Sequence, residues 1–169
     1  MVGLTGMMIH SLAFCQKGII TIGAGPVMGF PVSNKNFSYY YKNGIGGSLQ
    51  ANIGMTKLGS ITTKVFFLSM GAKKPPVTEK TSLTIIKGGY RTNFSDSRFF
   101  VDADAGFAKY GSGNGHFVIG GTVGYSFEIS KGSYIDLFPS YSQIFGTGSN
   151  RMWLTAHVLY RFSLKNKRK

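Results

Sequence analysis

Two histidines, His116 and His157, are the candidate general bases of this sequence, because the third histidine, His10, lies in an apolar N-terminal segment. A Ser-His-Asp site would combine one of them with a serine and with a carboxylate such as Asp136. The candidate serines are Ser126, Ser140, Ser142 and Ser163. No G-x-S-x-G motif marks any of them as a nucleophile. We therefore expect His157 to make structural hydrogen bonds near Arg161, and His116 to lie close to a loop.

Asp102 and Asp104 stand two residues apart, which places both carboxylates on one face of a β-strand, as in some acid/base sites. Six carboxylates occur in the chain, and four of them fall in segments that alternate as strands do. The polar faces of such segments also carry four cations. Buried charges need partners of opposite sign, so we predict an internal ion network rather than a catalytic pair. Its members are Lys64, Lys87, Arg91, Asp102, Asp104, Glu128, Asp136 and Arg161.

No pattern in the sequence indicates a metal or a cofactor. Cys15 is the single cysteine, which excludes an intrachain disulfide and a cysteine-based zinc site. Histidines and acids do not cluster at the spacing of metal ligands. The segment Gly111–Gly115 lacks the lysine and the strand-to-helix context of a phosphate-binding loop, so we interpret it as a hairpin turn. We expect no metal, no cofactor and no enzymatic activity.

The elements that position these residues have a hydrophobic period of two, which is typical of β-strands. Most are long enough for the 9–11 residues or so that a tilted strand needs to cross a bilayer, whereas strands of soluble domains average about 5–6. The sequence therefore predicts an all-β fold, an eight-stranded antiparallel up-and-down transmembrane β-barrel. The expected strands are Ile19–Phe30, Ile45–Met55, Ile61–Gly71, Ser82–Thr92, Phe99–Tyr110, His116–Ile129, Tyr134–Phe145 and Met152–Leu164.

The connections between these strands alternate between longer loops and short turns, which is the arrangement of bacterial outer-membrane barrels. The predicted loops at one end are Asn34–Asn43, Lys73–Thr81, Gly111–Gly115 and Gly146–Asn150. The predicted turns at the other end are Thr56–Ser60, Asn93–Arg98 and Ser130–Ser133. Both chain termini should lie on the side of the short turns.

The face pattern is clearest in the last strand, where Leu154, Val158 and Phe162 oppose Thr155 and His157. The fourth strand fits less well, because its apolar and basic residues share one face, and this leaves its register open. Those residues are Leu83, Ile85, Lys87 and Arg91. An eight-stranded barrel is just wide enough to be filled by side chains, so we expect a plugged lumen without an open pore. Residues predicted to fill it are Lys64, Phe66, Leu68, Met70, Phe138 and Arg161.

Aromatic residues near the strand ends predict belts at the two membrane interfaces. They include Tyr90, Tyr110, Tyr125, Tyr134, Tyr141, Phe145, Trp153 and Tyr160. The run Tyr39, Tyr40 and Tyr41 is the best candidate for recognition of a surface partner by a loop, because exposed aromatics beside lysines make adhesive contacts.

The chain carries 19 Lys+Arg against 6 Asp+Glu, a net charge of +13. The basic residues that do not belong to the predicted ion network fall mostly in the connections and at the C-terminus. This distribution favours contact with lipid headgroups or lipopolysaccharide phosphates over a nucleic-acid groove. We divide the chain into a signal peptide (residues 1–16), a barrel domain (17–164) and a basic tail (165–169). Leu12–Cys15 also partly matches a lipoprotein box, which would make Cys15 the acylated first residue.

The sequence resembles small OmpA/OmpX-like outer-membrane β-barrel proteins of the Bacteroidetes type. The resemblance rests on Phe14–Gly18, Gly23–Phe30, Gly88–Arg91, Phe99–Tyr110 and Leu159–Phe162. It implies a place in the outer membrane of a Gram-negative bacterium, as a monomer in contact with membrane lipid and lipopolysaccharide. It also implies that Tyr160 and Phe162 in the closing strand serve as the signal for the barrel-assembly machinery.

These observations predict a structural or adhesive role, with extracellular loops that bind a protein or a glycan. One alternative is a small lipid-modifying enzyme, a hydrolase or acyltransferase, that uses His116 or His157 at the lipid-facing rim. A second is a secreted, lipocalin-like soluble barrel that carries an apolar ligand. Alternation by itself does not say which face of the strands is inside.

Overall fold

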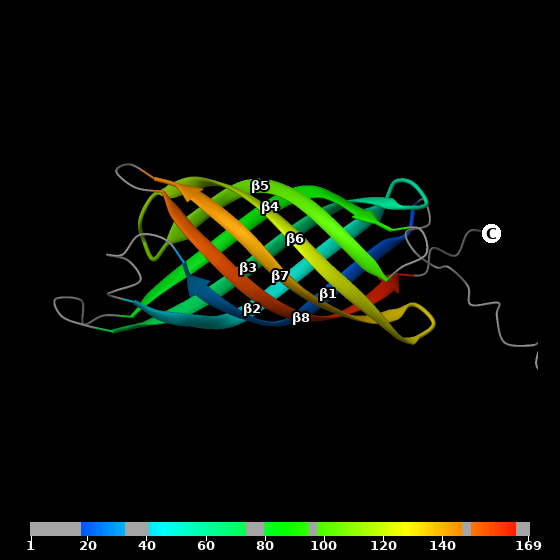
Figure 1. Ribbon diagram of the computed structural model, residues 1–169, viewed down its shortest axis with the longest axis horizontal. Helices are drawn as coiled ribbons and strands as arrows, with labels where there is room; N and C mark the ends of the chain where they lie inside the picture. Colours follow the sequence, from blue (N-terminus) through cyan, green and yellow to red (C-terminus); the bar gives the residue numbers. More distant parts are fainter. Residues whose placement is uncertain (1–17, 33–40, 74–79, 95–97, 147–149, 165–169) are drawn as a thin grey trace, which may run out of the picture.

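The computed structural model describes residues 18–32, 41–73, 80–94, 98–146 and 150–164. Within them, eight strands pair antiparallel with their neighbours in the chain, and β1 pairs with β8 to close a barrel (Figure 1). The strands are β1 (Ile20–Pro31), β2 (Tyr41–Gly54), β3 (Gly59–Ala72), β4 (Thr81–Asn93), β5 (Phe99–Tyr110), β6 (Gly115–Ser130), β7 (Ser133–Phe145) and β8 (Arg151–Leu164). The predicted eight-stranded antiparallel barrel is confirmed.

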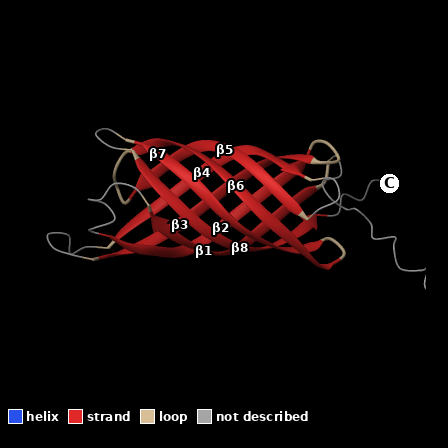
Figure 2. Ribbon diagram, viewed as in Figure 1, coloured by secondary structure: helices blue, strands red, loops and turns tan. Residues whose placement is uncertain are grey.

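The strands wind obliquely around a long central axis, and every regular element of the described residues is a strand (Figure 2). No helix in the described part of the chain is long and apolar enough to cross a membrane. Strand β1 begins and strand β8 ends at the same end of the barrel (Figure 1). We call this the turn end, because it also holds the short turns, and we call the opposite end the loop end.

Strand β2 begins at Tyr41, four residues before the predicted start. Tyr41 pairs with Ala72 and Gly44 pairs with Met70, so β2 holds one extra residue in this interval, which is a β-bulge. The glycines and Asn43 in this stretch suggest a turn, but pairing with β3 overrides that local preference. Tyr41, predicted to lie in a loop, is instead a half-buried strand residue that packs against the interior.

The burial of side chains alternates along the strands with a period of two. In β8, Trp153, Thr155, His157 and Leu159 are buried, whereas Leu154, Val158, Tyr160 and Phe162 are exposed. Three of the residues assigned to the interfacial belts thereby face inward, because Trp153 is 0% exposed, Tyr134 is 3% exposed, and the half-buried Tyr110 packs against the interior. Their position in the alternation along the strand (their strand parity), and not their aromatic character, decides whether their side chains face the interior or the outside.

The interior has an apolar layer at the loop end and a charged layer toward the turn end. The apolar layer consists of Val27, Phe66, Leu68, Met70, Leu83, Ile85, Ala108, Val118, Ile144 and Trp153. Strand β4 passes through both layers, so Leu83 and Ile85 face the same interior as Lys87 and Arg91. Apolar and basic residues share one face of this strand because the strand passes from the apolar layer into the charged layer. The strand itself is regular.

The connection between β6 and β7 is a tight turn through Lys131 and Gly132, closed by the pairing of Ser130 with Ser133. Gly132 has φ of 84°, in the left-handed region that favours glycine. Short connections of this kind keep sequential strands in register, so that inward residues of neighbouring strands meet at the same height in the barrel.

Candidate functional site in the barrel interior and at its loop end

The interior ion network is built around Asp102 on β5. Its carboxylate accepts hydrogen bonds from Nε and Nη2 of Arg91, at 2.8 and 3.2 Å, and lies 2.5 Å from Nζ of Lys64. Cζ of Arg91 also lies 3.6 Å from the centre of the Phe100 ring. Residues of β3, β4 and β5 are therefore held together by charge-assisted bonds and by a cation–π contact.

Asp136 on β7 forms the second centre of the network and is fully buried. It accepts hydrogen bonds from Nε of Arg161 at 2.8 Å, from Nη1 of Arg91 at 3.3 Å and from Oγ of Ser126 at 2.7 Å. The Arg161 guanidinium stacks over the Tyr134 ring at 4.5 Å. Arg91 thus joins the two carboxylates across the lumen.

Lys87 extends the network toward the apolar layer. Its Nζ lies 2.8 Å from Oδ1 of Asp104 and donates a hydrogen bond to Oγ of Ser142 at 3.1 Å. Lys64 also contacts Asp104, at 3.2 Å, and donates to Oγ1 of Thr122 at 3.0 Å. Because four cations face three carboxylates, the hydroxyl groups supply acceptors that the carboxylates alone would not provide.

Gly120 on β6 leaves the space for this part of the network. A Cβ atom there would lie 2.5 Å from Oδ1 of Asp104 and 2.7 Å from Nζ of Lys87, whereas one on the neighbouring Gly121 would meet no atom closer than 3.6 Å. We expect Gly120→Ala to destabilise the folded barrel by about 1–3 kcal/mol through overpacking. Gly121→Ala, the matched control, should cost clearly less. Urea titration of both refolded variants checks this, and equal midpoints would contradict it.

The structure brings together seven of the eight predicted network residues: Lys64, Lys87, Arg91, Asp102, Asp104, Asp136 and Arg161. Glu128 is the exception. It faces inward near the end of β6 but is only half-buried, and it takes part in no ion pair among the described residues. It pairs with Tyr134 in the register of β6 and β7, beside the short turn.

Sequence reasoning did not identify the neutral residues that bond to or stack on the network as its partners, although it considered three of the serines as nucleophiles and Tyr134 as a belt residue. These partners are Phe100, Thr122, Ser126, Tyr134, Ser140 and Ser142. Each lies on the same face of its strand as a residue predicted for the network. Extending the inward face residue by residue from Asp102, Glu128 and Asp136 would have identified them.

The residues weighed for a Ser-His-Asp site are not assembled into one. His157 is buried, with Nε2 2.8 Å from Oγ1 of Thr155 and Nδ1 3.3 Å from Oγ of Ser48, and it stacks on Phe138 at 4.5 Å. In the described part of the chain, no carboxylate contacts His157. Ser126 bonds instead to Asp136. His157 therefore lies in the lumen, and its placement at a lipid-facing rim is wrong.

His116 lies at the start of β6, half-buried, with its ring centre 6.5 Å from that of Tyr110. No group of three or more His, Cys, Asp or Glu side chains in the described ranges is arranged to hold a metal ion. The arrangement in the lumen ties every carboxylate of the network to at least one cation, which is chemistry suited to holding strands together.

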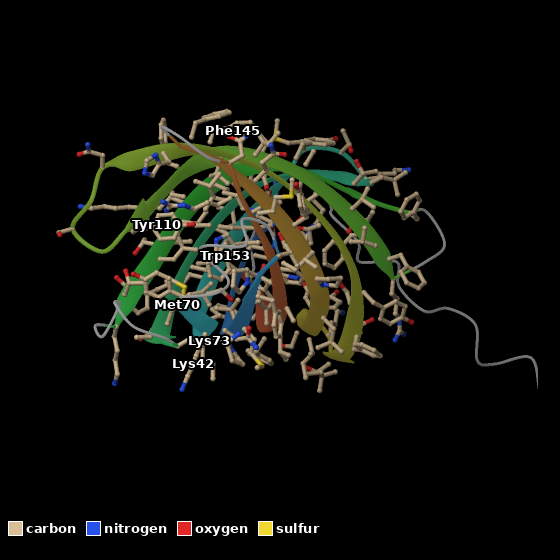
Figure 3. All side chains as sticks on the ribbon, turned by 60° about the vertical axis from the view of Figure 1, so that its left-hand side comes forward. Lys42, Met70, Lys73, Tyr110, Phe145 and Trp153 are labelled. Atoms are coloured by element: carbon tan, nitrogen blue, oxygen red, sulfur yellow. The ribbon has the colours of Figure 1, made fainter. Side chains whose placement is uncertain are left out.

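At the loop end, Trp153 and Tyr110 lie across the mouth of the barrel. Nε1 of Trp153 donates a hydrogen bond to the Tyr110 hydroxyl at 2.9 Å, and the Arg151 guanidinium lies 4.6 Å from the Tyr110 ring centre. Figure 3 shows Met70, Tyr110 and Trp153 inside the strands, while Lys42 and Lys73 project from the barrel edge. Of the three tyrosines proposed for loop recognition, Tyr39 and Tyr40 lie outside the described residues.

The outer face of the barrel is apolar in its middle region. Large hydrophobic side chains are exposed around it, among them Leu49 (59%), Phe107 (66%) and Val123 (57%). Tyr160 and Phe162, the residues assigned to assembly, are on this outer face of β8. A lipocalin-like carrier would have the opposite distribution, with apolar side chains around an internal ligand, so that alternative does not fit the structure.

No model of a known protein family matches the chain, and no curated protein matches it in sequence. Among solved structures, it is similar to OprG of Pseudomonas aeruginosa, with a TM-score of 0.62 and 8% identity over 89% of this chain and 98% of that one. It is also similar to Neisserial surface protein A, with a TM-score of 0.65 and 14% identity over 86% and 97% of the two chains.

A third similar structure is Ail of Yersinia pestis, with a TM-score of 0.58 and 14% identity over 87% of this chain and all of that one (100%). At sequence identities this low, the structural similarity establishes a shared fold and no more. The chain has the fold of small outer-membrane β-barrels, which agrees with the OmpA/OmpX-like resemblance at the level of architecture. The Bacteroidetes-type assignment stays a prediction.

Proposed function

We propose that this chain is an integral protein of a bacterial outer membrane, whose rigid barrel presents basic loops for adhesive contact outside the cell. The observation that carries this proposal is the inverted polarity of the barrel. Ion pairs are buried inside, and large apolar side chains are exposed around the outside. Exposed apolar surface of this extent is favourable in lipid and costly in water.

The proposed role is structural, with a plugged lumen. The apolar layer and the ion network occupy successive heights of the interior, and an eight-stranded barrel leaves little more than the room that side chains fill. Because the network carboxylates are ion-paired, they are poor candidates for general bases, and we propose a non-enzymatic function. Residues 1–16 would be removed as a signal peptide, and Tyr160 and Phe162 would be read during assembly.

The proposed partner is an anionic glycan. The described residues near the loop end include the cations Lys42, Lys73, Lys80, Lys109 and Arg151 and no carboxylate, although Glu79 lies in the stretch outside them. A similar structure shows Ail, the attachment invasion locus protein of Yersinia pestis, in complex with the heparin analogue sucrose octasulfate, with a TM-score of 0.53 and 14% identity. Cations on a rigid frame suit repeated sulfate or carboxylate groups.

The test uses the chain refolded into detergent micelles. We expect a band whose gel mobility differs between unheated and boiled samples, and retention on immobilised heparin that is lost near 1 M salt, where the screening length falls to about 3 Å. Lys80→Ala/Lys109→Ala should elute at lower salt than Lys57→Ala/Lys131→Ala, a charge-matched control at the turn end. Equal elution of the two variants would contradict recognition at the loop end, and a protein soluble without detergent would contradict membrane insertion.

A further inference from the structure

A groove lies at the edge of the barrel, at the loop end of β1 and β2. Its volume is about 650 Å³, and its lining residues are Met28, Pro31, Tyr41, Lys42, Asn43, Ile45 and Lys73. Met28 and Ile45 are register partners on the two strands, and both are exposed, at 44% and 64%. They give the groove an apolar floor on the lipid-facing side of the barrel.

The β-bulge of β2 determines the polar end of this groove. The extra residue lets the adjacent Lys42 and Asn43 both be exposed, which regular alternation would not allow. Gly71 on β3 has no side chain, and the Lys42 stem lies over it, since a Cβ atom there would be 3.7 Å from Cδ of Lys42. Lys73 follows the end of β3 and lies beside Lys42 at the same edge (Figure 3).

The groove thus combines two ammonium groups and an amide at the loop end with an apolar floor of Met28 and Ile45. A membrane lipid of the outer leaflet has the same order, with a phosphate above its acyl chains. Long lysine side chains at a membrane surface bring their charge to the level of the headgroups. Among the described residues, none that lines the groove is acidic, which suits an anionic headgroup.

We propose that this groove is a binding site for one phosphorylated lipid of the outer leaflet, with its phosphate between Lys42 and Lys73 and an acyl chain along Met28 and Ile45. A soluble glycan or free phosphate would use the lysines but not the apolar floor, so the two halves of the groove together favour a lipid. This inference rests on the membrane placement proposed above.

The experiment uses the full refolded chain in detergent micelles, after its heat-modifiable mobility has been verified. Native mass spectrometry then measures binding of bisphosphorylated lipid A. We expect one bound lipid, and a loss of affinity of about 25-fold in Lys42→Ala/Lys73→Ala, because each lysine near an anionic surface contributes about fivefold. Lys57→Ala/Lys131→Ala and Lys109→Ala should bind as the unmodified chain does. Met28→Ala/Ile45→Ala should weaken binding through the loss of apolar contact.

A second probe tests which part of the lipid the lysines contact. Dephosphorylated lipid A should bind the unmodified chain about as weakly as bisphosphorylated lipid A binds Lys42→Ala/Lys73→Ala. Its affinities for the unmodified chain and for Lys42→Ala/Lys73→Ala should be equal. Equal losses in all the lysine variants, full binding of the dephosphorylated lipid, or displacement by millimolar inorganic phosphate would each overturn the proposal. If lipid A does not bind but the chain is retained on heparin as expected, the lipid site is wrong and the proposed function stands. If no heat-modifiable band is seen, both the lipid site and the proposed function are wrong.

Discussion

Asp136→Ala is expected to lower the free energy of unfolding by about 3–5 kcal/mol, the cost of leaving buried charges without their partner. Asp136 is the carboxylate that pairs with Arg161, at 2.8 Å, and it also accepts a hydrogen bond from Arg91. Its removal leaves the Arg161 guanidinium without its carboxylate and takes one of two carboxylate partners from Arg91, which keeps Asp102. Urea titration of the barrel in lipid vesicles, followed by Trp153 fluorescence, measures the change.

Glu128→Ala is the matched control for this prediction, because it removes the same charge from the same face of the barrel without breaking an ion pair. A change within about 0.5 kcal/mol is expected, as for a residue outside any network. The double variant Asp136→Ala/Arg161→Met should recover part of the loss, because it removes the cation that Asp136→Ala leaves without its carboxylate, whereas Arg91 keeps its bonds to Asp102. A loss in Glu128→Ala as large as in Asp136→Ala would show that the network does not stabilise the fold.

Leu49→Lys is expected to destabilise the barrel in a bilayer by about 2–4 kcal/mol, the cost of a lysine on the lipid face near the midplane. Leu49 is 59% exposed, and its register partners Ala24 and Val65 lie in the middle of their strands. In a water-soluble protein the same change at an exposed leucine would be close to neutral. The free energy of unfolding in vesicles of defined lipid therefore tests the orientation of the faces directly.

The control for Leu49→Lys lies on the same strand and the same face. Ile53 is 46% exposed and pairs with Ile20 at the turn end, where a lysine reaches the headgroups. Ile53→Lys should cost only about 0–1 kcal/mol. A flat dependence on depth, with equal small effects at both positions, would contradict a membrane-spanning barrel.

The period-two pattern made most of the fold predictable from sequence. Strand β5 was predicted with its observed bounds, Phe99–Tyr110, and the other boundaries except the start of β2 differ by at most two residues. The ion network was predictable for the same reason, since in a closed barrel the residues of one parity meet in a narrow interior. Asp102 and Arg91 need no motif to find each other, because register pairs them across β4 and β5.

The remaining differences have separate causes. The bulge at Lys42 and Asn43 depends on pairing with β3, and residue types there suggest a turn. Trp153 and Tyr134 have the composition of an interfacial belt, but their parity places them inside. Glu128 faces inward as the network residues do, yet it is only half-buried and forms no ion pair among the described residues. Strand pairing therefore explains the first difference and the inward or outward position in the strand explains the second, whereas the third depends on side-chain placement that alternation does not give.

The alternation of the strands also bears on how such a chain reaches its membrane. Every apolar outward residue is followed by an inward one that is often polar, so the mean hydropathy of the whole chain is only +0.03. No segment after residue 18 has the 18 or more consecutive apolar residues that would stop transfer through an inner membrane. In the proposed outer-membrane placement, the unfolded chain would be exported as a polar polypeptide, and its lipophilic surface would arise only when the barrel closes.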